Sequence, residues 1–191
     1  FLAAIVGGWL DQILSRAVDV LMAIPALIFA LLLMTIASVW SNQLGIDRTI
    51  FMILIIAMID STRVYRLARA VGQNIVVMDY IEAAKLRGEG MGYLIFKEIL
   101  PNAMAPLLVQ GTFVAASAVL TEAILSFLGL GLPPDVPTWG NIMAEGRVQF
   151  SQQPGNVLFP ALFLVPTVLA INLLGDGLRD VLDPKFAKRV G

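Results

Sequence analysis

The chain has 191 residues, of which 58% are hydrophobic and 14% are charged, and its formal net charge is −1. Soluble domains carry about 25% charged residues, so this composition indicates a protein surrounded by membrane lipid. The charge argues against a nucleic-acid partner, which would need a clustered basic face. Because the chain has no Cys and no His, we expect no disulfide, no metal site and no histidine acting as a general base.

Four apolar stretches are candidate membrane spans, since a spanning helix needs about 20 predominantly apolar residues. They cover approximately Val20–Val39, Thr49–Ile59, Asn102–Leu130 and Val157–Leu174. The second stretch continues into a helix with arginines in its later turns. Phe1–Val6 is expected to end a further span that begins upstream. Four such stretches in one short chain favour an all-α, polytopic helical membrane protein over a soluble protein with buried helices.

The distribution of basic residues predicts the orientation of the chain. Four spans place both chain ends, and the region between the second and third spans, on one side of the membrane. That side holds all of the 13 Lys and Arg residues except Arg48 and Arg147. Because loops rich in Lys and Arg stay in the cytoplasm, we expect this side to be cytoplasmic. Trp40 and Trp139 fall at the outer ends of spans, where tryptophan is favoured.

A polar segment, YIEAAKLRGEGMGYLIFKEILPN, separates the second and third apolar stretches. Asp79 and Glu82 resemble a capping box, so a helix is expected to start near Asp79. Gly88 and its neighbours should end that helix in a turn. A second short helix, Met91–Leu100, should follow and be ended by Pro101. The segment is therefore expected to form two short helices on the cytoplasmic face.

The residues of this segment allow two interpretations. It can be an amphipathic hairpin that only connects two spans along the membrane surface. It can also be a docking site, because the small side chains of Ala83 and Ala84 leave a low ridge that a partner could approach closely. The physical chemistry of the segment leaves both interpretations open.

The segment also resembles a known motif. The sequence EAAKLRG (Glu82–Gly88), followed by ILPN (Ile99–Asn102), is similar to the EAA motif of ATP-binding-cassette (ABC) importer permeases. Three further blocks resemble the dipeptide, oligopeptide and nickel group of these permeases. They are GGWLDQILSRAVDVLMAIP, SFLGLGLPPDVPTWGNIMAEGR and NLLGDGLRDVLDP. Together these blocks extend the resemblance over essentially the whole chain, in order.

The resemblance implies a fold and a coupling site. The fold would be the transmembrane domain of ABC importer type I, with cytoplasmic coupling helices. Residues 1–191 would form a single permease domain, truncated at its N-terminus, and residues 79–100 would be its cytoplasmic EAA coupling segment. In that segment Glu82 would offer a polar contact to the ATPase. Ala83 and Ala84 would allow close seating, and Gly88 would set the turn.

The resemblance also implies a function and partners. The chain would be a permease subunit of an ATP-driven importer in the bacterial inner membrane, forming the path for a peptide or a related small solute. Its partners would be a second homologous permease subunit, two cytoplasmic ATP-binding subunits and an extracytoplasmic solute-binding protein. The sequence has no GxxxxGK[ST] phosphate loop, so ATP would be bound by the ATPase subunits. The chain itself would hold no cofactor and catalyse no reaction.

Glu122 is the only ionisable residue inside the third apolar stretch. A charged group at membrane depth costs about 2.5–3.5 kcal/mol on insertion scales, and such groups usually face a bundle interior or water. Glu122 is therefore expected either to line the solute path or to accept a hydrogen bond from a backbone or hydroxyl donor.

The outer loop GLPPDVPTWGN contains Pro133, Pro134 and Trp139. It is interpreted as a rigid loop that contacts the binding protein or forms the outer gate, in preference to a passive connector.

A protein of another class remains an alternative. A membrane scaffold or channel subunit could use the polar segment only as an anchor on the inner surface, and it would bind no ATPase. An intramembrane hydrolase is disfavoured, because the sequence has no His, no Cys and no GxSxG-type elbow to supply a nucleophile and its base.

Overall fold

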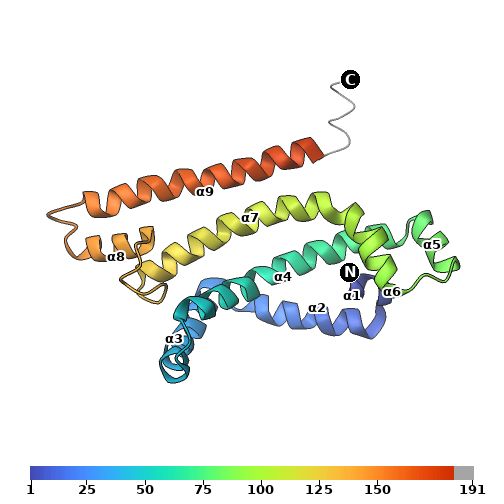
Figure 1. Cartoon of the computed structure of the whole chain (residues 1–191), viewed down its shortest axis with the longest axis horizontal. Coiled ribbons are helices and arrows are strands. Elements are labelled where there is room, and N and C mark those ends of the chain that lie inside the picture. Colours follow the sequence, from blue (N-terminus) through green and yellow to red (C-terminus); the bar gives the residue numbers. More distant parts are fainter. Residues whose placement is uncertain (183–191) are drawn as a thin grey trace. The chain divides into compact units, whose positions relative to one another are not determined.

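The computed structural model describes residues 1–182 of the chain, and within this range it contains helices and no strand. In chain order the helices are α1 (Leu2–Val6), α2 (Gly8–Ala23), α3 (Ala26–Leu44), α4 (Arg48–Val76), α5 (Asp79–Leu86), α6 (Met91–Tyr93), the π-helix η1 (Leu94–Ile99), α7 (Leu100–Phe127), α8 (Trp139–Val148) and α9 (Gly155–Leu182) (Figure 1). The all-α prediction is confirmed. Three basic residues used to predict the orientation, Lys185, Lys188 and Arg189, lie outside the described residues.

Three helical segments among the described residues are long and apolar enough to cross a membrane: Ala26–Leu44, Met91–Phe127 and Gly155–Leu182. The first begins six residues later than the sequence suggested, because Pro25 separates α2 from α3. The expected span Thr49–Ile59 lies in α4, which has 29 residues but carries arginines in its second half. α4 is not among the three segments, and the four-span orientation stays a prediction.

The apolar helices expose large side chains. On α9, nine large hydrophobic residues have more than half of their surface exposed: Leu158, Phe159, Leu162, Phe163, Val165, Leu169, Leu173, Leu174 and Val181. In a water-soluble monomer such a surface would be an aggregation liability. In a bilayer, lipid tails and neighbouring membrane helices cover surfaces of this kind.

Pro101 does not end a helix, so that prediction was wrong. A continuous helical segment runs from Met91 to Phe127. The π-helix η1 ends at Ile99, and Pro101 is the second residue of α7. Proline removes one backbone donor. Helices at membrane depth tolerate proline because local π-helical adjustments and neighbouring groups satisfy the freed carbonyls. The rule that proline stops a helix therefore fails here.

The described residues form two compact units, and α4, α7 and α9 contribute residues to both. The first unit contains Phe1–Ala23, Ser61–Gly111 and the end of α9. Its buried apolar core joins the end of α4, α5, η1 and the start of α7. The core residues are Ile75, Ile81, Ala84, Leu94, Ile99 and Ala103, with Phe1, Ile5, Val71, Val76 and Leu107 packed against them.

The second unit contains Ile24–Asp60 and Thr112–Leu174. Residues of α3, the first half of α4 and the end of α7 form its core: Ala30, Met34, Ala37, Met52, Ile55 and Leu125. This unit also holds Glu122 and the outer loop. That residues 1–191 form a single permease domain stays a prediction.

Candidate functional sites

The helix that contains the EAA-like sequence starts where it was predicted to start, but not for the predicted reason. α5 begins at Asp79, with Met78 as its N-cap, and no side chain caps it. The expected capping box is therefore wrong. Asp79 and Glu82 both lie in the first turn, where negative charge interacts favourably with the helix dipole.

The predicted turn after α5 is confirmed. Gly88 has a φ of 79°, in the left-handed region that favours glycine. Its N–H donates to Lys85 O at 3.0 Å, and the N–H of Glu89 donates to Ala84 O at 3.2 Å. These two bonds form a Schellman motif, which satisfies the free carbonyls at the end of the helix. The ending of α5 is thus fixed by backbone hydrogen bonds around one glycine.

The two faces of α5 have different surroundings. Ile81 and Ala84 are fully buried in the core of the first unit. Glu82 and Ala83 are exposed, and Leu86 is 83% exposed. The expectation that Ala84 belongs to a surface ridge is therefore wrong. Ala84 lies three residues after Ile81 and shares its helix face. Because Ile81 packs into the core, Ala84 is buried there as well.

Arg87 lies in the turn between α5 and α6 and reaches a carboxylate of η1. Its guanidinium lies 3.9 Å from the carboxylates of both Glu89 and Glu98. The Arg87 side chain is 55% exposed, and exposed ion pairs contribute about 0–1 kcal/mol. The turn is consequently held by the Schellman bonds and the apolar core, with a small electrostatic contribution.

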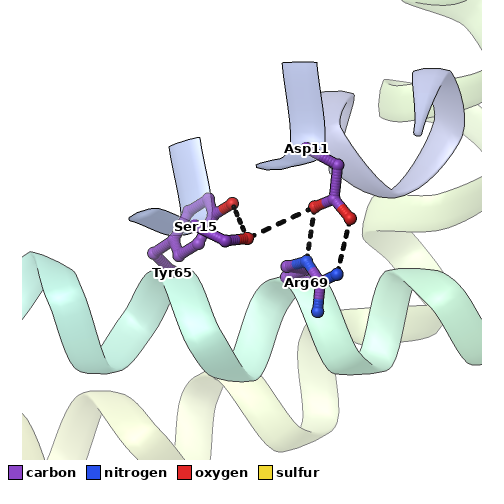
Figure 2. A network of polar contacts seen from close by, with 4 residues as sticks. All are labelled: Asp11, Ser15, Tyr65 and Arg69. Carbon is purple, nitrogen blue, oxygen red and sulfur yellow. Dashed lines mark hydrogen bonds and ion pairs between the residues drawn. The ribbon is translucent and has the colours of Figure 1, made fainter. Parts of the chain in front are cut away.

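A network of polar contacts that was not predicted joins α2 to α4 in the first unit (Figure 2). Arg69 Nε and Nη2 donate to the two carboxylate oxygens of Asp11, each at 2.5 Å. The Ser15 hydroxyl lies 3.5 Å from Asp11 Oδ1 and 3.1 Å from the Tyr65 hydroxyl. We call these four residues the α2–α4 clamp.

The clamp shifts the ionisation of both charged members, which lie outside the candidate spans. The hydrogen bond from Arg69 lowers the pKa of Asp11 below its ordinary value, and the bond to Asp11 raises the pKa of Arg69. One turn beyond the clamp, Arg66 pairs with Asp19 at 2.7 Å. A sequence signal did exist, because Asp11, Ser15 and Asp19 recur every fourth residue and so lie on one face of a helix.

Glu122 has a hydroxyl partner in the second unit. The hydroxyl of buried Ser126 donates to Glu122 Oε1 at 2.6 Å, and Ser126 Oγ itself accepts from Leu132 N at 3.3 Å. This arrangement matches one of the two interpretations, in which Glu122 serves as an acceptor inside the protein. A role in the solute path stays a prediction.

The outer loop is held by hydrogen bonds and close packing. The amide of buried Asn141 donates to Pro133 O at 3.0 Å and to Val136 O at 2.9 Å. Thr138 caps α8 by accepting from Asn141 N. The predicted rigidity of the loop is consistent with these bonds. Pro134 is exposed and Trp139 is half-buried.

The base of the loop is also packed tightly on α7. A Cβ on Gly131 would lie 2.2 Å from Ser126 Oγ, and a Cβ on Gly140 would lie 2.5 Å from Ala123 O. Arg48, at the start of α4, donates to Gly129 O at 3.3 Å. Within residues 1–182 no group of three acidic side chains is arranged to hold a metal ion. The base of the loop is thus fixed to α7 by close packing and to α4 by a hydrogen bond.

A family model described as "Binding-protein-dependent transport system inner membrane component" matches residues 1–188. The chain belongs to this family. Membership in the binding-protein-dependent transport family, together with the helical structure, confirms the predicted ABC importer type I transmembrane fold. As a member with several apolar helices, the chain is a multi-pass protein of the bacterial inner membrane.

Individual proteins are similar over nearly the whole chain. A probable peptide ABC transporter permease protein of Sinorhizobium fredii is 40% identical over 94% of this chain and 59% of its own length. A putative peptide transport system permease protein of Brucella suis is 42% identical over 97% of this chain and 62% of its own length. A putative peptide permease protein of Brucella ovis is 38% identical over 96% of this chain and 59% of its own length. The chain thus spans about three fifths of the length of these relatives.

Proposed function

We propose that the chain is a permease subunit of an ATP-driven importer, which moves a peptide or a related small solute across the inner membrane. Family membership and the names of the relatives, which are peptide permeases, support this function. The observation that carries the coupling role is the geometry of α5. This helix exposes Glu82 and Ala83 while Ile81 and Ala84 fix it to the first unit.

The packing of α5 against the neighbouring helices is suited to transmitting a movement of α5 to them. Its buried face packs against Ile75 at the end of α4 and against Leu94 and Ile99 in the Met91–Phe127 segment. Protein cores are close-packed and resist compression. A force applied by a partner to the exposed face would therefore be transmitted to the long helices on both sides of α5. Gly88 and its Schellman bonds keep the helix at a fixed angle to the segment that follows.

The partners follow from this role. Two cytoplasmic ATPase subunits would bind and hydrolyse ATP, and one of them would hold α5 at its surface. A second homologous permease subunit would complete the solute path, and an extracytoplasmic binding protein would deliver the solute. In this proposal the chain carries no catalytic residue and no cofactor, and its contribution is the path and the connection to the motor.

The outer region would receive the solute. The loop around Pro133, Pro134 and Trp139, fixed by Asn141, would contact the binding protein or close the path from outside. Glu122 is the candidate polar residue of the path, and its bond from Ser126 would hold the carboxylate in one position.

The coupling role is tested with a bulky substitution on the exposed face of α5. Ala83→Trp in the full-length permease should leave the subunit folded, because Ala83 is exposed. It should abolish most co-purification with the ATPase subunits and most solute uptake in proteoliposomes. Ala17→Trp is the matched control, because Ala17 is also an exposed alanine on a helix of the same unit.

The outcomes separate the proposal from its rival. Loss of ATPase binding in Ala83→Trp with normal binding in Ala17→Trp supports coupling through α5. Normal ATPase binding and uptake in both variants would remove α5 from the ATPase interface. A wild-type complex that binds no ATPase subunit would favour a scaffold or channel subunit.

A further inference from the structure

The α2–α4 clamp holds α4, the helix that precedes the coupling segment in the chain. Arg69 is about two turns before the end of α4, at 3.6 residues per turn. The last two residues of α4, Ile75 and Val76, pack in the core that holds α5. The clamp therefore contacts α4 about two turns before the residues through which α4 packs with α5.

The central pair of the clamp has the geometry of a strong contact. Both carboxylate oxygens of Asp11 accept from Arg69, and such bidentate pairs are more specific in direction than single-point ion pairs. The Asp11 side chain is 15% exposed and that of Arg69 is 31% exposed. The neighbouring pair of Arg66 and Asp19 is 53% and 49% exposed, so solvent screens it more strongly. The two pairs connect the same helices with different expected strength.

α1 reinforces the attachment at the end of α4. A Cβ on Gly72 would lie 3.0 Å from Phe1 Cδ1 and 3.1 Å from Ala4 Cβ, so α1 packs closely against the turn that follows Arg69. α1 is joined to α2 through Gly7 and Gly8, both with positive φ. α1 and α2 thus contact consecutive turns of α4, one by packing and one by the clamp.

We propose that Asp11 and Arg69 are positioning residues, which make α2 follow the movements of the coupling segment. This inference rests on the proposed function of α5. A displacement of α5 is passed through the shared core to the last turns of α4, and the clamp passes it on to α2. Along the chain α2 continues through Pro25 into α3, a candidate span. The coupling segment then has a second route to the spans, besides the Met91–Phe127 segment in which it continues directly.

The test separates coupling from folding. The full-length permease is assembled with its partner permease, ATPase subunits and binding protein in proteoliposomes, and solute uptake is measured per ATP hydrolysed. Asp11→Asn and Arg69→Gln should lower uptake per ATP about five- to tenfold, within the range by which coupled sites usually influence one another. Basal hydrolysis and the yield of complex should stay close to those of wild type. Arg66→Gln is the matched control on the same two helices and should couple normally.

Charge reversal provides the rescue. The double variant Asp11→Arg with Arg69→Asp can form the pair in the opposite direction, and it should recover most of the lost uptake per ATP. Variants that yield less complex but transport normally per ATP would overturn the inference and leave a merely structural contact. A wild-type complex without ATPase binding would overturn the proposed function as well, whereas normal coupling in both single variants would overturn only the role of the clamp.

A second measurement does not depend on breaking the pair. Because this chain has no Cys of its own, Ser15→Cys and Tyr65→Cys can be joined by a short bifunctional thiol reagent while Asp11 and Arg69 stay in place. If α2 and α4 move as one body, the bridged complex should transport like the unbridged one. Loss of uptake on bridging would mean that the two helices must separate during transport, which would overturn the inference.

Discussion

Gly131→Ala tests how tightly the outer loop is packed on α7. A Cβ at this position would lie 2.2 Å from Ser126 Oγ, 2.5 Å from Ser126 N and 2.6 Å from Ser126 Cα. Two of these atoms belong to the helix backbone and cannot rotate away, so the loop or the end of α7 must shift. Overpacking of this kind typically costs about 1–3 kcal/mol. Loss of the bond between Leu132 N and Ser126 Oγ adds about 0.5–1.5 kcal/mol.

The expected destabilisation is therefore about 2–4 kcal/mol. For a chain of this size each kcal/mol lowers the midpoint of thermal unfolding by about 2–4 °C, which gives a shift of about 5–15 °C. The assay is thermal unfolding of the purified permease in one detergent. Gly111→Ala is the control, because a Cβ there meets no atom within 4 Å and alanine is the better helix former. Equal midpoints for Gly131→Ala and wild type would show that the loop is not packed as described.

Three further outcomes are expected. Gly88→Ala should cost about 1–2 kcal/mol, because an L-residue must adopt the left-handed φ of 79°, and faster limited proteolysis around residues 86–91 would measure the loosening. Asn141→Ala leaves the carbonyls of Pro133 and Val136 without their donor and should cost about 1–3 kcal/mol in thermal unfolding. The pKa of folded Asp11 lies below its ordinary value of 3.8, so the stabilisation by this group is complete above that pH and is lost as the pH falls below it. Wild type should therefore lose more thermal stability than Asp11→Asn on acidification from about pH 5 to pH 3.

Features that depend on neighbouring residues in the sequence could be predicted. The turn at Gly88 follows from a local helix-ending signal and is present. The start of α5 at Asp79 was placed correctly, although the capping box that suggested it is absent. The apolar stretches gave three segments long enough to span a membrane, with the first boundary moved by Pro25. α4 departs from the expectation because an apolar half and an arginine-bearing half share one continuous helix.

Features that depend on which surfaces meet could not be predicted. Ala84 was assigned to an exposed ridge because of its small size. It lies about one turn after Ile81, however, and both side chains point into the core. Pro101 was expected to stop a helix, but the adjoining π-helix and the surroundings allow the helix to continue. The bond between Asp11 and Arg69 joins residues 58 positions apart. The sequence contains the polar face of α2 but no sign of the helix that it meets.

Because α5 has one buried and one exposed face, the residues that pack in the permease core differ from those that a partner could contact. The inward residues, Ile81 and Ala84, must suit the permease's own core. The outward residues, Glu82, Ala83 and Leu86, are free of that constraint. A permease of this kind could be adapted to a different motor by exchanging the outward residues of an eight-residue helix, with the membrane part unchanged. Specificity for the ATPase subunit and specificity for the solute would then evolve independently within one permease subunit.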